Sequence, residues 1–170
     1  MSITAVQTLT RPPIVTANPP HISKFSPQLF LNQKDSPLIL VTDHDEFIRK
    51  LLCRMLEKEG YQVLVASNSE QCLEAYILFH PNLVILDALM PGIDGFTCCR
   101  ELRALPEGDR TLILMTTSLN DSDSARQALK AGATDYITHP IHRSQLCQQV
   151  RLLIQPSTLE QQVQQLKSRV

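Results

Sequence analysis

Five polar residues with possible chemical roles directly follow short apolar segments of the sequence. The first is Asp87, which comes after the run LVIL at 83–86 and just before a stretch interrupted by proline and glycine. A short apolar run bounded by turn residues is typical of a buried strand. Ligands of open α/β sheets bind beyond the carboxyl ends of the strands. Asp87 is therefore a candidate functional carboxylate from its position alone.

The other four residues occupy similar positions in the sequence. Asp43 and His44 follow the segment LILVT, Thr117 and the threonine before it follow the segment LILM, and His139 follows DYIT. The carboxyl ends of parallel strands meet at one edge of a sheet. We therefore expect two carboxylates, two imidazoles and a hydroxyl group to converge on a single site that includes Asp87.

The elements expected to position these residues alternate between strands and amphipathic helices. Apolar runs predict five strands, at 38–41, 62–66, 83–86, 112–115 and 135–138. Apolar residues at helical spacing predict five helices, at about 47–56, 67–79, 94–105, 122–131 and 143–154. Strict alternation of strands and helices predicts a parallel sheet covered by helices on both faces.

Capping residues predict where some of these helices begin and end. Gly60 is the predicted C-cap of the first helix. Ser67 and Glu70 have the spacing of a capping box at the start of the second helix. His80 stands before Pro81, which predicts the end of that second helix.

Composition limits the class of protein. The chain has 170 residues, of which 43% are hydrophobic, which suits one domain with additional tails. Its formal net charge of −1 provides no broad basic face for a phosphate backbone, so we expect no direct contact with nucleic acid. The apolar runs are too short to cross a membrane, and the N-terminal segment lacks the apolar core of a signal peptide. We therefore expect a cytoplasmic protein.

The five cysteines have no arrangement that predicts a cross-link or a zinc site. They are odd in number, and no pair of cysteine or histidine residues has zinc-site spacing. We expect free thiols in a reducing compartment.

The two ends of the chain differ from its centre. Residues 1–36 contain several prolines and no glycine, which favours an extended or disordered N-terminal tail. Residues 37–155 form the predicted domain. Within 156–170, apolar residues at 159, 163, 166 and 170 have heptad spacing, which favours the start of a coiled-coil linker to a possible output domain. A short solvated helix is the alternative for this last segment.

Two motifs carry a resemblance to a known family. The segments LVILDALMPGIDGF (83–96) and KAGATDYITHP (130–140) resemble the receiver domain of two-component response regulators. The segment LILVTDHDEFIRKLL (38–52) resembles that family more loosely, and the likeness extends from residue 37 to about 155. It implies an α/β fold of the flavodoxin-like (CheY-like) type, with five parallel strands in the order 2-1-3-4-5 and helices on both faces.

The resemblance implies a function in a two-component phosphorelay. Asp87 matches the phosphoacceptor, which receives a phosphoryl group from a histidine kinase or a phosphotransfer protein. Asp43 matches an acid that helps to hold Mg²⁺, and Leu89 matches the position whose backbone carbonyl also binds that ion. His44 stands where the family has a second acid, so its role as a metal ligand is uncertain.

Further positions match the parts of the family that respond to phosphorylation. Thr117 matches the hydroxyl residue that hydrogen-bonds the phosphoryl group, and Ser118 matches the small residue beside it. Tyr136 matches the switch aromatic. His139 replaces the lysine that pairs with the phosphoryl group, and the bond before Pro140 is expected to be cis, as it commonly is in the family.

The two histidines change the chemistry expected of the pocket. Two aspartates and two neutral histidines carry the same formal charge as the three carboxylates and one lysine of the family. However, imidazole is a poorer partner than carboxylate for Mg²⁺, and histidine is charged only near or below about pH 6.5. We expect weaker magnesium binding and slower or less stable phosphorylation.

Each candidate residue also has an ordinary structural interpretation. Asp43 and Asp87 are acids of a kind that also cap helices or point into solvent, and Asp45 is expected to cap the first helix rather than to replace a missing metal ligand. Thr117 could simply complete a strand, and Tyr136 could be a packing aromatic.

His44 and His139 are interpreted as ordinary polar replacements in preference to a transition-metal pair. As replacements they could tune the response of the site to pH.

Three functional classes remain to be compared. The first is a receiver that switches conformation on phosphorylation and controls a partner or linked output domain, with a homodimer as a possible assembly. The second is a pseudo-receiver that binds proteins independently of phosphorylation. The third is an enzyme acting on a phosphorylated small molecule, which the sequence disfavours because it lacks nucleotide-binding loops and a second acid two residues after Asp87. A receiver is not an enzyme beyond assisting its own phosphorylation and dephosphorylation.

Overall fold

Five parallel strands form the centre of the computed structural model, which describes residues 36–117 and 122–155. The strands are β1 (Leu38–Thr42), β2 (Gln62–Ala66), β3 (Leu83–Asp87), β4 (Leu112–Thr117) and β5 (Asp135–Thr138). They pair in parallel in the order β2-β1-β3-β4-β5. The predicted flavodoxin-like sheet and its strand order are confirmed. Strand β4 runs two residues further than predicted and so includes the two threonines at its end.

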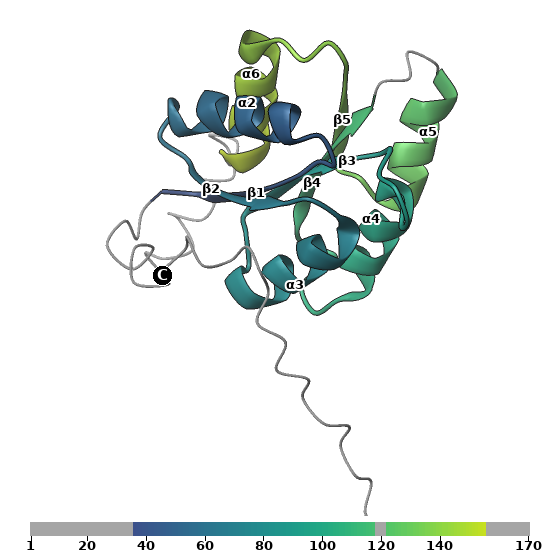
Figure 1. Cartoon of the computed structure of the whole chain (residues 1–170). Coiled ribbons are helices and arrows are strands. Elements are labelled where there is room, and N and C mark those ends of the chain that lie inside the picture. The colour runs from purple at the N-terminus through teal and green to yellow at the C-terminus, as the bar shows by residue number, and fades with distance from the viewer. Residues whose placement is uncertain (1–35, 118–121, 156–170) are drawn as a thin grey trace, which may run out of the picture. The chain divides into compact units, whose positions relative to one another are not determined.

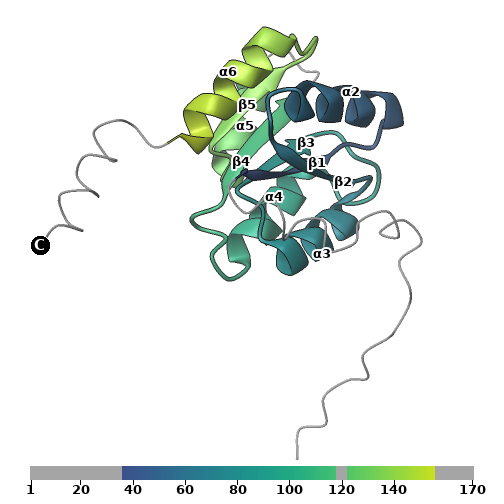
Figure 2. The same cartoon turned by 90° about the vertical axis from the view of Figure 1, so that its left-hand side faces the viewer.

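Helices cover both faces of this sheet (Figure 1, Figure 2). Helices α2 (Glu46–Glu57) and α6 (Arg143–Ile154) lie on one face. Helices α3 (Ser69–Phe79), α4 (Gly95–Ala104) and α5 (Ser122–Ala131) lie on the other. Because each helix between two strands leads from the carboxyl end of one strand back to the start of the next, all five strands end at the same edge.

Side chains of alternate strand residues build the core beneath α2 and α6. The apolar residues on that face of β1 and β3 are joined by leucines of α2 and by two apolar residues of α6. In the central strand β3, every residue from Leu83 to Asp87 is buried. A strand buried on both faces reads as a continuous apolar run, which is why LVIL was recognisable in the sequence.

The observed helix ends correct two of the predicted caps. Helix α3 is capped by Asn68, whose side chain accepts the backbone N–H of Gln71, and not by Ser67. The backbone and hydroxyl of Ser67 donate instead to the side-chain oxygen of Gln71, so the capping pair is displaced by one residue. Helix α2 has its C-cap at Lys58, and Gly60 lies two residues beyond it with a φ of 89°.

The predicted end of α3 is confirmed. His80 is its C-cap and has a left-handed backbone conformation immediately before Pro81.

All five cysteines are free thiols, as predicted. Burial raises the pKa of Cys53 and of Cys99 to about 11, so these two thiols are protonated and poorly nucleophilic at neutral pH.

Some predictions fall on parts of the chain that the structure does not describe. The predicted tail lies outside the described residues except for Ser36, and the heptad segment 156–170 lies outside them entirely. Within 36–117 and 122–155, no helix is long and apolar enough to span a bilayer.

Candidate functional site

Asp87 lies at the carboxyl end of the central strand and is nearly enclosed. Its residue exposure is 6%, and its Oδ1 atom accepts the backbone N–H of Leu89 over 3.0 Å. Strand β3 pairs with β1 on one side and β4 on the other, so both neighbouring strands end beside this carboxylate. The structure therefore places Asp87 where the sequence predicted it.

Gly95 allows α4 to begin directly against the end of β3. A Cβ atom at this position would lie 2.0 Å from the carbonyl oxygen of Asp87, so no side chain fits there. The backbone N–H of Gly95 donates to the carbonyl of Ala88 over 3.0 Å. From the sequence, Gly95 was predicted only as part of the break after the strand, and its role in supporting the site was missed. The signal available was its place in PGIDG, between a strand and a helix.

Asp43 is the second buried carboxylate at this edge, with an exposure of 3%. Its Oδ1 accepts the backbone N–H of Asp45 over 2.8 Å, and its carbonyl accepts a hydrogen bond from the Arg49 guanidinium. Burial raises the pKa of the Asp43 carboxyl above its ordinary value of 3.8, and the nearby charge of Asp87 adds to that shift. The hydrogen bond from Asp45 opposes it. Two carboxylates in a poorly solvated space therefore repel one another and attract cations.

His44 joins the two carboxylates. Its side chain is about half exposed at 48%, and its Nδ1 lies 2.7 Å from Oδ2 of Asp87 and 3.8 Å from Oδ1 of Asp43. Ligand atoms of these three residues all lie within 4.8 Å of one another. The predicted convergence of Asp43, His44 and Asp87 on one edge is thus observed.

Asp45 has a different role from its neighbours. Its Oδ1 accepts the backbone N–H groups of Phe47 and Ile48 at the start of α2, over 2.7 and 3.3 Å. The prediction that Asp45 caps this helix is confirmed. Its carboxylate is engaged at the helix start and does not replace the missing acid.

Thr117 and His139 lie at the ends of the next two strands. Thr117 is buried at the end of β4, and its carbonyl accepts the backbone N–H of His139 over 2.8 Å. The peptide bond from His139 to Pro140 is cis, as predicted. His139 is close enough to Asp43 to lower the pKa of that carboxyl slightly, against the larger effect of burial, which raises it. Both residues therefore flank the cluster.

Tyr136 is half buried on β5, and its carbonyl accepts the side-chain amide of Gln149 over 3.1 Å. Ser118 lies outside the described residues. The switch role of Tyr136 and the role of the Leu89 carbonyl stay predictions.

The donor set is suited to a divalent cation. Mg²⁺ is commonly held by one or two carboxylates together with water and phosphate oxygens, which Asp43 and Asp87 can satisfy. The Thr116 hydroxyl is 1% exposed and lacks a partner among the described residues. Thr116 is paired in register with Asp87 on the neighbouring strand. An unpartnered buried hydroxyl on the strand next to Asp87 fits a site completed by a hydrated ion.

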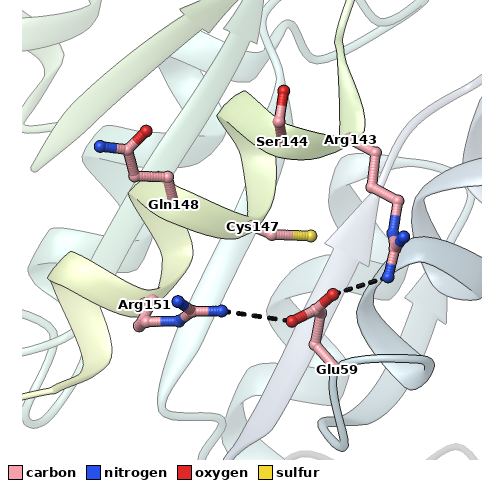
Figure 3. A pocket seen from close by; sticks show the side chains of 6 residues that line it. All are labelled: Glu59, Arg143, Ser144, Cys147, Gln148 and Arg151. Carbon is pink, nitrogen blue, oxygen red and sulfur yellow. Dashed lines mark hydrogen bonds and ion pairs between the residues drawn. The ribbon is translucent and has the colours of Figure 1, made fainter.

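A groove of about 460 Å³ lies away from this cluster, between α6 and the turn that follows α2 (Figure 3). The Glu59 carboxylate accepts hydrogen bonds from Arg143 over 2.7 Å and from Arg151 over 3.3 Å, as the dashed lines show. Cys147 lies between the two arginines and points toward Glu59. The two arginines hold the α2 turn against α6, and the groove shares no residue with the site around Asp87.

Comparison with known proteins places the site in context. The profile of the response regulator receiver domain matches residues 39–151. The chain is 39% identical over 116 residues to the probable transcriptional regulator ycf27 of Cyanophora paradoxa, covering 68% of this chain and 47% of that protein. It is 42% identical over 123 residues to the transcriptional regulatory protein AruR of Pseudomonas aeruginosa, covering 69% and 49%. The chain spans about half the length of the curated relatives it matches.

Solved structures show the same likeness. A putative response regulator from Chloroflexus aurantiacus has a TM-score of 0.69 and 31% identity, covering 71% of this chain and 98% of that one. The BeF₃-activated N-terminal receiver domain of RstA from Klebsiella pneumoniae has a TM-score of 0.65 and 30% identity, covering 70% and 99%.

Proposed function

Because the chain belongs to the response regulator receiver domain family, which acts in two-component signalling, we propose that Asp87 is its phosphoacceptor. The observation that carries this proposal is the position of the buried Asp87 carboxylate at the end of the central strand, beside Asp43 and His44. In that position the carboxylate is held at the edge of the sheet beyond which ligands of such sheets bind.

The proposed reaction transfers a phosphoryl group from a phosphorylated histidine of a histidine kinase or a phosphotransfer protein. A carboxylate oxygen of Asp87 forms the new bond to phosphorus while the bond from phosphorus to the histidine nitrogen breaks, which leaves an acyl phosphate. A bound Mg²⁺ would reduce the repulsion between the carboxylate and the phosphoryl oxygens. Asp43 and Asp87, with the carbonyl of Leu89, would hold that ion.

Thr117 and His139 are placed to act on the product. In the proposal, the Thr117 hydroxyl hydrogen-bonds a phosphoryl oxygen and His139 pairs with the phosphoryl group when its imidazole is protonated. Tyr136 responds to this change, and the resulting conformation is read by an output domain or a separate partner. The domain catalyses no reaction on a separate substrate and assists only its own phosphorylation and dephosphorylation.

The observed contacts of Asp87 also favour a second candidate, a pseudo-receiver that binds partners without phosphorylation. Its Oδ1 accepts the N–H of Leu89, and its Oδ2 lies within hydrogen-bond distance of His44. Two carboxylate oxygens offer about four lone-pair directions, so these contacts leave room for a further bond. His44 must move before Oδ2 can bond to phosphorus. Phosphorylation is therefore expected to be slow in a receiver, and absent in a pseudo-receiver in which His44 stays in place.

The rest of the proposal concerns the whole protein. We propose a receiver at 37–155, flanked by the tail and linker segments expected at 1–36 and 156–170, which lie outside the described residues except for Ser36. The relatives named as transcriptional regulators support an output in gene regulation, with no direct nucleic acid contact by the receiver itself. We propose a cytoplasmic location, no association with membranes, and a homodimer as the possible assembly.

Intact mass spectrometry tests the phosphoacceptor. The protein is incubated with Mg²⁺ and acetyl phosphate or phosphoramidate, and we expect an adduct of about 80 Da that the Asp87→Asn variant does not form. The incubation is repeated between about pH 5.5 and 8, because histidine side chains in general change their charge in that range. If no adduct forms at any of these pH values, the pseudo-receiver is the better explanation.

A further inference from the structure

We propose that this pocket binds a borderline divalent ion of the first transition row in preference to Mg²⁺, with His44 Nδ1 as a direct ligand beside the carboxylates of Asp43 and Asp87. The inference rests on the proposed function, because the same ion would serve the phosphoryl transfer. It adds the chemical class of that ion and gives His44, which stands where the family has an acid, the role of a metal ligand.

The spacing of the three donor atoms fits one metal ion. Ligand atoms about 2.1 Å from a common ion lie about 3.0 Å apart at a right angle and about 4.2 Å apart when opposite. His44 Nδ1 lies 2.7 Å from Asp87 Oδ2 and 3.8 Å from Asp43 Oδ1, and all three donor atoms lie within 4.8 Å of one another. Small side-chain rotations are sufficient to bring the set around one ion.

The chemistry of the donors selects the class of ion. Two aspartate carboxylates offset the charge of a dication, as they would for Mg²⁺. The third donor is an imidazole nitrogen, which suits Co²⁺, Ni²⁺, Cu²⁺ and Zn²⁺ better than Mg²⁺. The aspartates are buried, whereas the His44 side chain is about half exposed, so an ion can enter from the imidazole side.

The Thr116 hydroxyl is an independent sign of a missing ligand. It is buried, it has no partner among the described residues, and it belongs to the residue paired with Asp87 across β3 and β4. In a parallel pair, residues in register point to the same face of the sheet, so the Thr116 and Asp87 side chains leave neighbouring strands on the same face. A water molecule bound to the ion would give the hydroxyl its hydrogen-bond partner.

Co²⁺ is the probe that tests this inference, because its visible absorption reports its ligands. The full-length chain, freed of metal, is titrated with Co²⁺ with and without competing Mg²⁺, and affinities are confirmed by calorimetry. We expect Co²⁺ to bind at least about tenfold more tightly than Mg²⁺, because one of its donors is an imidazole. The His44→Asp variant should lose about tenfold of that preference and change the absorption spectrum.

His142→Ala is the matched control. His142 is exposed at the start of α6 and makes no side-chain capping bond, so its removal should leave the Co²⁺ spectrum unchanged. If His44→Asp keeps the Co²⁺ preference of the natural chain, or if His142→Ala abolishes the spectrum, the inference is wrong.

The two proposals fail in different ways. An Asp87 adduct formed with Mg²⁺, together with an ion preference that does not depend on His44, overturns the inference and leaves the phosphoacceptor in place. Co²⁺ bound through His44 in a chain that forms no adduct with any of these ions supports the inference and overturns the phosphoacceptor proposal.

Discussion

The two edges of the sheet have opposite electrostatic designs. At the edge where the strands begin, Arg103 donates hydrogen bonds to the carbonyls of Gly108, Thr111 and Gly132 and to the hydroxyl of Thr134. At the edge where the strands end, Asp43 and Asp87 are buried beside each other. Among the ion pairs of the described residues, both acids pair only with His44, which carries a positive charge only when it is protonated. At the first edge a cationic side chain provides hydrogen bonds to backbone carbonyl groups. At the second edge two negative charges lie close together.

This difference assigns stability to one edge and chemistry to the other. The Arg103 network connects the end of α4 with the loops that lead into β4 and β5, and Tyr76 adds a hydrogen bond of 2.6 Å between its hydroxyl and Thr111. Hydrogen bonds from a charged donor to buried carbonyls stabilise a fold. Paired buried carboxylates destabilise it unless a cation is present. Removal of the Arg103 charge and removal of one aspartate charge should therefore change stability in opposite directions.

The largest effect on stability is expected at Gly95, where α4 contacts the end of β3. Gly95→Ala should destabilise the fold by at least about 3 kcal/mol, because the new Cβ would collide with the backbone of Asp87. Denaturant unfolding measures this loss. Gly92→Ala in the same loop is the control, since its Cβ would meet open space and the cost of its positive φ should be about 1 kcal/mol. If both variants lose the same free energy of unfolding, the close approach of Gly95 to the Asp87 backbone is not the cause of the loss.

The next effect tests the stabilising edge. Arg103→Ala should lower the free energy of unfolding by about 3 kcal/mol, because several carbonyls lose a charged donor. Acetyl phosphate labelling of Asp87 should continue at temperatures where the variant is folded. Arg100→Ala, which removes one exposed hydrogen bond to Thr97 on the same helix, should change stability by less than about 0.5 kcal/mol. An Arg103 variant that is folded and yet cannot be labelled would contradict the division between the edges.

A smaller effect of opposite sign is expected from Asp43→Asn. The pKa of Asp43 is raised in the folded protein above its ordinary value of 3.8, mainly by burial, so the folded state binds this proton more tightly than the unfolded state does. Stability is therefore lost as the pH rises from 3.8 through the folded pKa. Without added metal, the variant should melt at a higher temperature than the natural chain at neutral pH.

The pH dependence supplies the check on that prediction. The difference in melting temperature between the two chains should shrink as the pH falls through the folded pKa of Asp43 toward 3.8. Asp109→Asn, at an exposed position, serves as the control and should show no such trend. A destabilised Asp43→Asn variant at neutral pH would mean that the two acids are not a source of strain.

The smallest effect on stability concerns His139. His139→Lys should leave the melting temperature nearly unchanged and should lengthen the lifetime of the acyl phosphate or strengthen beryllofluoride binding, because lysine places a fixed cation at this position. The decay of the adduct, followed by intact mass at pH 8, measures the effect. His142→Lys adds the same charge three residues further along the chain and serves as the control. No change in either property would show that the cation at this position is unimportant here.

Sequence patterns identified the elements and their order because strand and helix periodicities are local. The Asp45 cap of α2 was predictable for the same reason, whereas the cap of α3 was assigned one residue early because Ser67 and Asn68 offer competing side chains. The convergence on Asp87 was predictable because parallel strands end together.

Contacts between distant segments could not be read in this way. His44 and Asp87 are 43 residues apart, and their 2.7 Å contact depends on side-chain rotamers and on the twist of the sheet. Arg103 gave no signal, because an arginine near the end of an amphipathic helix ordinarily points into solvent. The need for glycine at position 95 arises from a backbone approach that no periodicity encodes.

That approach has a mechanical consequence. With no side chain between the backbones of Gly95 and Asp87, the first turn of α4 is expected to follow the end of β3 as a rigid lever. The helix has 10 residues and a length of about 15 Å, and Arg103 anchors its far end. Because Arg103 holds the end of α4 in place, a small displacement at Asp87 would rotate the helix about Arg103 and would not shift it along the sheet.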